Sequence, residues 1–181
     1  MILSDSELVE MLREPRTRRE GFAVLVKQYS EKLYWKVRRI VLSHEDANDV
    51  LQNVFIKVWN NLQNFQGKSS LSTWLYRIAI NESLDFLRKQ KQTDMVISDE
   101  ELSVSSRLMS DEYFDGDEIQ ARLQEAVARL PEVQRTVFNL KYFEEMKYSE
   151  ISQILNTSEG ALKASYHLAV KKITEYLHSF D

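Results

Sequence analysis

The chain has 181 residues, 43% hydrophobic and 29% charged, which suffices for one domain or two small domains with buried cores. It contains no cysteine, which excludes disulfides and thiolate metal sites, and no run approaching the ~18 apolar residues of a membrane span. The N-terminus lacks a signal-peptide pattern, and we expect a cytoplasmic protein without direct membrane insertion.

The net charge of −4 is distributed unevenly along the chain. Residues 1–91 carry 15 basic and 11 acidic side chains, residues 92–118 carry one Arg and nine acids, and residues 119–181 carry eight of each. The acidity is therefore concentrated in one segment, and the N-terminal part is mildly basic. Only 4 Gly and 2 Pro in the whole chain favour helices over strands.

Capping signals and apolar periodicity predict four helices in residues 1–91. Ser4 and Glu7 have capping-box spacing and predict a short helix that ends near Pro15. Thr17 and Glu20 repeat this spacing before a longer helix with an apolar stripe.

A third helix is predicted to begin at Ser43, which can cap it. A polar loop from Asn64 to Ser70 then precedes a fourth helix at about residues 72–91.

Residues 92–118 lose the helical periodicity and are rich in acids and serines, which indicates a flexible linker. Helical patterning returns at Ile119, and Pro131 begins another helix.

The segment 148–173 predicts two short helices joined by a polar turn. Ser149 can cap the first helix, Asn156 lies in the turn, and Ser158 can cap the second helix. The second helix has a buried stripe made of Leu162, Tyr166, Ala169 and Ile173. Small, polar and basic residues on the other face suit a helix that approaches DNA, although most helical hairpins contact no nucleic acid.

Catalytic or metal-binding chemistry is not predicted, and we expect neither an enzyme nor a cofactor. His44, His167 and His178 lie far apart in sequence and lack the spacing of metal ligands. The chain has no glycine-rich phosphate loop and no nucleophile elbow.

The fourth helix and the loop before it combine aromatic, amide and basic side chains. Aromatic faces stack on exposed bases, and cations follow the phosphates beside them. Packing explains part of the pattern equally well, because Trp74 can bury in the core and Phe65 can close the loop over it. The candidate nucleic-acid contacts are Phe65, Lys68, Ser72, Trp74, Tyr76, Arg77, Asn81, Arg88 and Lys89.

A polar strip on the third helix is a candidate surface for binding another protein. Asp49, Gln52 and Asn53 lie on the side away from the apolar stripe. Asp46 belongs to the same strip, but stabilisation of the helix start explains this residue equally well.

Three segments in this order resemble the bacterial RNA polymerase sigma factors of the small extracytoplasmic-function type. They are DANDVLQNVFIKVW, STWLYRIAINESLDFLRK and LPEVQRTVFNLKYFEEMKYSEISQILNTSEGALKASYHLAVKKI, and the resemblance extends over nearly the whole chain. It implies an all-α fold with two small helical domains, residues 1–91 and 119–181, joined by the acidic linker 92–118. The C-terminal domain would contain a helix-turn-helix.

The resemblance also implies partners and roles. Asp49, Gln52 and Asn53 would bind core RNA polymerase. The loop from Phe65 to Ser72 would trap an unpaired base of the promoter −10 element, supported by Trp74, Tyr76, Arg77 and Asn81, while Arg88 and Lys89 would contact phosphates. The −35 element would be read by Ser158, Gly160, Lys163, Ala164, His167 and Lys171. Many members of the family are inhibited by an anti-sigma factor, so one is a candidate partner here.

The recognition helix departs from the family pattern. Many relatives have arginines where this chain has Ser165, Leu168 and Val170, so we expect fewer ionic contacts to the −35 element. Two alternatives differ from a sigma factor in class. One is a helix-turn-helix regulator that binds duplex operator independently of polymerase, and the other is an all-α adaptor that binds only proteins.

Overall fold

The computed structural model describes residues 2–93 and 116–180, and every regular element in these residues is helical. The predicted all-α fold is confirmed. The chain divides into two compact units, Met1–Met95 and Val96–Asp181. The predicted acidic linker lies outside the described residues except at its ends, where residues 92–93 finish one helix and residues 116–118 lead into another. No helix in the described ranges combines the length and apolar character that crossing a membrane requires.

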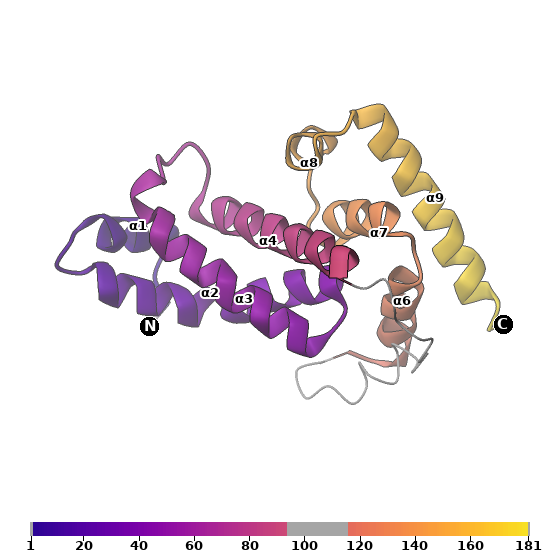
Figure 1. Ribbon diagram of the computed structural model, residues 1–181, viewed down its shortest axis with the longest axis horizontal. Coiled ribbons are helices and arrows are strands. Elements are labelled where there is room, and N and C mark those ends of the chain that lie inside the picture. The colour runs from indigo at the N-terminus through magenta and orange to yellow at the C-terminus, as the bar shows by residue number, and fades with distance from the viewer. Residues whose placement is uncertain (1, 94–115, 181) are drawn as a thin grey trace. The chain divides into compact units, whose positions relative to one another are not determined.

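The N-terminal unit is a bundle in which α2, α3 and α4 pack against one another and α1 packs mainly on α2 (Figure 1). Apolar side chains at helical spacing form its core, including Leu33, Val54 and Leu75, each fully buried. A short 3₁₀ turn, η1, continues the end of α3. The elements are α1 (Asp5–Arg13), α2 (Arg18–Val41), α3 (His44–Asn61), η1 (Leu62–Asn64) and α4 (Leu71–Thr93).

Two of the three predicted caps in this unit are confirmed. The backbone N–H of Glu7 donates to Ser4 Oγ at 3.3 Å, and the Ser4 N–H donates to Glu7 Oε2 at 2.7 Å. Ser43 Oγ accepts from the N–H of Asp46 at 3.4 Å. The prediction for Thr17 is wrong, because this residue has a helical backbone and its hydroxyl donates to the Met11 carbonyl at 2.9 Å. Thr17 therefore closes the end of α1 rather than the start of α2.

Helix α1 is held tightly on α2 by a close backbone approach. A Cβ at Gly21 would lie 2.9 Å from the Cβ of Met11, so only glycine fits between the two helices at this separation. Arg18 Nε donates to the carbonyl of Leu12 at 3.0 Å and so satisfies one of the acceptors at the end of α1.

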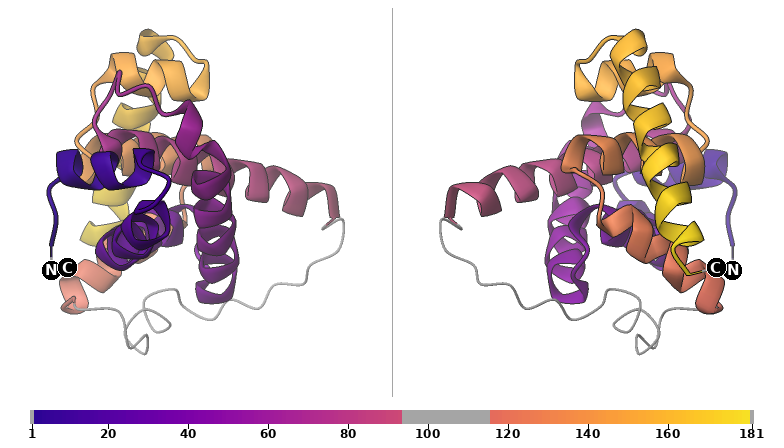
Figure 2. Two further views of the ribbon diagram at one scale, coloured as in Figure 1. Left: turned by 90° about the vertical axis from the view of Figure 1, so that its left-hand side faces the viewer. Right: turned by 90° about the vertical axis from the view of Figure 1, so that its right-hand side faces the viewer.

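The C-terminal unit packs its last helix, α9, against α6, α7 and α8 (Figure 2). Leu130, Phe138, Ala169 and Ile173 belong to its buried core. Pro131 precedes α7, as predicted. The elements are α6 (Glu118–Ala128), α7 (Glu132–Phe138), a π-helical turn η2 (Asn139–Phe143), α8 (Tyr148–Leu155) and α9 (Glu159–His178).

Candidate nucleic-acid and polymerase interfaces

A pocket of ≈ 260 Å³ lies between the end of α3 and the first half of α4. Its lining residues repeat at four- and three-residue spacing on both sides, so each wall is one face of a helix or of the turn that continues it. One wall is formed by Lys57, Asn61 and Asn64, and the other by Trp74, Ile78, Asn81 and Glu82.

The loop 65–70 starts at the aromatic wall of this pocket. The rings of Phe65 and Trp74 have centroids 5.1 Å apart and planes tilted by 47°, and both residues are half-buried. Gly67 has a φ of 71°, a conformation that glycine adopts without steric cost. Ser70 Oγ accepts from the N–H of Thr73 at 3.2 Å and thereby caps the first turn of α4. The sequence that forms the loop therefore also fixes the start of the helix behind the pocket.

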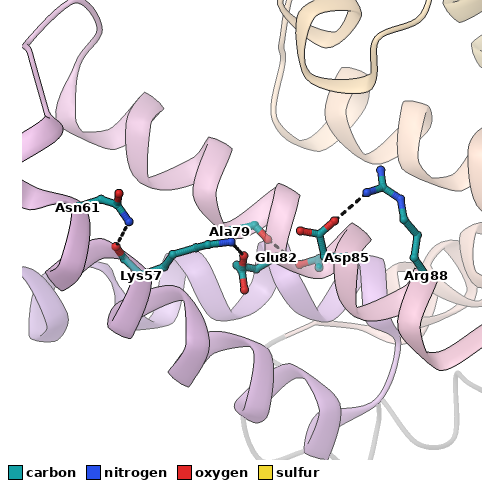
Figure 3. A network of polar contacts seen from close by, with 7 residues as sticks. Lys57, Asn61, Ala79, Glu82, Asp85 and Arg88 are labelled. Atoms are coloured by element: carbon teal, nitrogen blue, oxygen red, sulfur yellow. Dashed lines mark hydrogen bonds and ion pairs between the residues drawn. The ribbon is translucent and has the colours of Figure 1, made fainter. Parts of the chain in front are cut away.

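An ion pair across the pocket connects α3 to α4, and side-chain amides on the α3 wall bond to one another and to the backbone (Figure 3). The ammonium group of Lys57 forms an ion pair with Glu82 Oε1. Asn61 Nδ2 donates to the Lys57 carbonyl at 2.8 Å, and Asn64 Nδ2 donates to Asn61 Oδ1 at 3.3 Å. Among the described residues, the amide of Asn81 makes no hydrogen bond, so its donor and acceptor are both available to a ligand.

The predicted −10 residues do not all meet at this pocket. Trp74 and Asn81 line it and Phe65 packs against Trp74, whereas Lys68 is exposed in the loop. The backbone N–H of Ser72 donates to Asp5 Oδ2 at 3.4 Å, so this residue joins α4 to α1.

Tyr76 and Arg77 do not line the pocket. The Tyr76 ring lies under Lys36 of α2, with Nζ 4.0 Å from the ring centroid, and burial followed by the charge of Asp5 raises the pKa of Tyr76. The Nε of Arg77 is buried and makes no hydrogen bond within the described part of the chain. Further along α4, Arg88 is exposed and pairs with Asp85 at 2.7 Å, and Lys89 is also exposed (Figure 3).

The pocket has five lining residues that the sequence analysis missed. A signal for them existed, because the spacing of positions 57, 61 and 64 matches that of positions 74, 78 and 81. Helical periodicity shows that each set shares a face, but only the packing of α3 on α4 shows that the two faces meet. The missed residues are Lys57, Asn61, Asn64, Ile78 and Glu82.

The candidate polymerase-binding strip is exposed along α3. Asp49, Gln52 and Asn53 are all solvent-exposed, and Ile56, one turn further, is 54% exposed. Asp46 is half-buried at the capped start of the helix, which agrees with a role in the helix start. The strip therefore combines acidic and amide groups with one exposed aliphatic side chain.

Helices α8 and α9 form the predicted hairpin. Asn156 ends α8 with a φ of 50°, the left-handed conformation that asparagine tolerates. Ser158 Oγ accepts from the N–H of Ala161 at 3.3 Å and caps α9, as predicted. The predicted cap at Ser149 is wrong, because α8 begins at Tyr148 and its N-cap is Lys147, two residues before Ser149; the carboxylate of Glu150 accepts from the N–H of Lys147 at 3.0 Å.

The two faces of α9 differ as the sequence predicts. Leu162, Ala169 and Ile173 are buried, and Tyr166 stacks on Phe138 with ring centroids 5.8 Å apart. The other face is open to solvent, and its apolar members include Leu168, which is 46% exposed. The candidate −35 residues of α9 are all exposed, namely Gly160, Lys163, Ala164, His167 and Lys171, and so is the capping Ser158.

Both units match known protein families. The model of sigma-70 region 2 matches residues 25–93, and that of sigma-70 region 4 matches residues 120–173. The pocket, the loop before α4 and the polar strip of α3 lie inside the first match, and the helical hairpin lies inside the second.

Curated relatives match over most of their length. The chain is 33% identical over 157 residues to the ECF RNA polymerase sigma factor SigW of Bacillus subtilis, a match that covers 82% of this chain and 84% of the relative. It is 32% identical over 182 residues to the RNA polymerase sigma-H factor of Pseudomonas aeruginosa, covering 96% and 93%.

Solved structures share the fold at lower identity. The sigma factor RpoE of Bartonella quintana, determined in complex with the anti-sigma factor NepR, matches with a TM-score of 0.67 at 21% identity, covering 88% of this chain and 98% of that one. CnrH, determined in complex with the cytosolic domain of CnrY, matches with a TM-score of 0.64 at 19% identity, covering 98% and 96%. From the region matches and the curated relatives, the chain belongs to the sigma-70 family of RNA polymerase sigma factors, in its extracytoplasmic-function group.

Proposed function

We propose that three surfaces divide the work of this sigma factor: the α3 strip binds core RNA polymerase, the pocket holds an unpaired base of the −10 element, and the exposed face of α9 reads the −35 element. The protein would guide polymerase to its promoters and help open the DNA without covalent chemistry of its own. An independent regulator of duplex operators is not favoured, because both units match sigma-70 regions.

The observation that carries the proposal is the pocket between α3 and α4. Its ≈ 260 Å³ is slightly below the ~300 Å³ at which pockets for drug-sized ligands begin, which suits a single nucleobase. Proteins hold an extruded base by stacking and by hydrogen bonds to its edge. Trp74 and Ile78 offer aromatic and apolar surface here, and Asn81 offers an unengaged amide donor and acceptor.

Cations near the pocket would hold the phosphates on either side of the captured base. Lys68 is exposed in the loop, and Arg88 and Lys89 are exposed toward the end of α4. Each phosphate that such a residue neutralises strengthens binding without selecting a sequence. Tyr76 and Arg77 are not among the lining residues and would instead support α4, with Arg77 Nε as an unsatisfied donor.

Recognition of the −35 element would rely on close approach more than on charge. The face of α9 that carries Gly160 and Ala164 has small side chains, while Lys163, His167 and Lys171 supply donors around it. Exposed apolar atoms such as those of Leu168 can contact thymine methyl groups.

Two further expectations follow from the family. The protein would work in the cytoplasm, where RNA polymerase transcribes. We also expect an anti-sigma factor as an inhibitory partner, because one solved relative is bound to such a protein.

The test is promoter opening by holoenzyme reconstituted with core RNA polymerase. 2-Aminopurine in the non-template strand of the −10 element reports unstacking of bases by increased fluorescence. Asn81→Ala should reduce the signal roughly tenfold, since it removes the hydrogen bonds to the captured base, while binding to core stays unchanged. Asn60→Ala, an exposed asparagine outside the lining, is the matched control. Equal opening by Asn81→Ala and wild-type protein would refute the assignment of the pocket.

A further inference from the structure

Glu82 is an unexpected residue in a pocket proposed to receive DNA, since a carboxylate repels phosphates. The ion pair with Lys57 removes this difficulty, because the ammonium group neutralises the carboxylate locally (Figure 3). The side chain of Lys57 is 51% exposed and that of Glu82 only 15% exposed. The carboxylate therefore lies deeper in the pocket wall than its partner.

Half of the hydrogen-bonding capacity of this carboxylate is unused. Oε1 accepts from Lys57, but within the described part of the chain Oε2 accepts no hydrogen bond. Carboxylates are acceptors only when ionised, so Oε2 can bind a donor on a ligand and disfavours another acceptor. The neighbouring amide of Asn81 can adapt to either kind of group, because it offers both a donor and an acceptor.

The four bases differ at the edge that would reach this oxygen. An extruded base stays attached to its sugar, so the edge farthest from the sugar enters the pocket most deeply. Cytosine and adenine carry an exocyclic amino group there, N4 or N6, whereas thymine and guanine carry the carbonyl oxygens O4 or O6. A buried acceptor that faces a carbonyl oxygen remains unpaired, which is costly.

We propose that Glu82, held in place by Lys57, is a specificity-determining residue of this pocket and selects a base with an amino group at position 4 or 6. Cytosine and adenine are then favoured at the captured position over thymine and guanine, whose carbonyl oxygen would face Oε2. This inference rests on the proposed role of the pocket in base capture.

The sharpest probe is the comparison of 5-methylcytosine with thymine at the captured position. These bases have the same size and the same methyl group, and they differ in the amino or carbonyl group at position 4. Holoenzyme would first be challenged with promoters in which each non-template base of the −10 element is removed in turn, to locate the captured position. Opening is then measured with each of the two bases at that position.

Wild-type holoenzyme should open the 5-methylcytosine promoter on the order of tenfold more efficiently than the thymine promoter, as expected for one well-formed base contact. In Glu82→Gln the ratio should fall below about threefold, because the amide can also donate to O4. Asp85→Asn is the matched control, since it removes a carboxylate one turn away on α4 that pairs with Arg88 outside the lining, and it should keep the wild-type ratio.

The ratio is taken within each variant, so partial unfolding of Glu82→Gln lowers both values and leaves the ratio intact. Equal ratios for wild-type and Glu82→Gln, or a wild-type preference for thymine, would overturn the selectivity while leaving base capture standing. If no position responds to removal of its base, the proposed function of the pocket fails together with this inference.

Discussion

Gly160 lies in the first turn of α9, and a Cβ placed on it would meet no atom within 4 Å. No left-handed backbone or close internal contact requires glycine there, although glycine weakens a helix by roughly 0.5–1 kcal/mol relative to alanine. Close approach of an external surface such as DNA is a physical reason for its presence.

Gly160→Ala should therefore separate stability from function. We expect the melting temperature of the C-terminal unit to rise, with a gain of up to ~1 kcal/mol. We also expect weaker protection of the −35 element by holoenzyme in footprinting, since the added methyl group would hold α9 away from the DNA. Unchanged −35 protection would exclude a close contact at this position.

Lys36 on α2 is a second residue with a testable effect, because its contribution to stability depends on pH. Burial, followed by the charges of Arg39 and Lys32, lowers the pKa of Lys36 to about 8 from an ordinary value of 10.5. Because the folded state binds this proton more weakly than the unfolded state, Lys36 lowers stability at neutral pH, and this penalty disappears as pH rises from about 8 to 10.5.

Lys36→Met should thus be more stable than wild-type protein at pH 7, and its advantage should shrink steadily above pH 8. Urea unfolding of both proteins at pH 7, 8, 9 and 10 measures this difference. A constant advantage over the whole range would mean that the gain comes from packing of the methionine rather than from removal of the charge.

At the scale of elements, α1 lies against both the start of α4 and the loop that borders the pocket. Asp5 accepts hydrogen bonds from the hydroxyl of Tyr29 on α2 and from the N–H of Ser72 at the start of α4. At the other end of α1, a guanidinium nitrogen of Arg13 would lie 3.5 Å from a Cβ at Gly67. The sigma-70 region 2 match begins only at residue 25, so α1 lies outside it while its partners Tyr29, Gly67 and Ser72 lie inside.

Asp5→Ala should destabilise the N-terminal unit by ~1–3 kcal/mol, because the buried hydroxyl of Tyr29 loses its acceptor. Asp5→Asn keeps an acceptor oxygen and should cost clearly less. Urea unfolding followed by tryptophan fluorescence reports this unit, since all three tryptophans, Trp35, Trp59 and Trp74, lie in it. Equal losses in both variants would show that the carboxylate charge at the start of α4, rather than the Tyr29 hydrogen bond, provides the stability.

The helices could be predicted from sequence because their signals are local. Caps at Ser4, Ser43 and Ser158 depend on residues three positions away, and the apolar stripes follow from periodicity alone. The prediction at Thr17 failed because its hydroxyl bonds the Met11 carbonyl at the end of α1, and the prediction at Ser149 failed because the Glu150 carboxylate accepts from Lys147 instead. The π-helical turn at 139–143, where Tyr142 stacks on Phe138, was not predicted from the sequence.

The candidate site was less predictable than the helices. Trp74 and Asn81 were identified because aromatic and amide groups stand out on a helix that carries basic residues. Their partners on α3 are distant in sequence and separated from α4 by a loop. Lys57, for example, lies 25 positions before Glu82, so no helical spacing rule joins the two residues. Pairing of that kind depends on how α3 packs against α4.

At the scale of the whole molecule, the two units proposed to share DNA recognition differ in charge. Residues 119–181 carry equal numbers of acidic and basic side chains, so the C-terminal unit lacks the basic excess that drives binding to DNA. Two weak binding modules gain affinity when a common partner holds both, because the second contact then forms at high effective concentration. Core polymerase is the partner proposed to do this.

The free protein should accordingly bind duplex promoter weakly, and added core polymerase should raise the apparent affinity by on the order of 10²-fold or more. Fluorescence anisotropy of labelled promoter DNA, titrated with protein alone or with holoenzyme, measures both affinities at one salt concentration. Asp49→Ala should leave the weak binding of the free protein unchanged and reduce the gain from core, because Asp49 belongs to the exposed strip proposed to bind polymerase. Lys163→Ala should instead weaken the DNA contact of the holoenzyme. Tight binding of duplex by the free protein, unaffected by core, would contradict this division of roles.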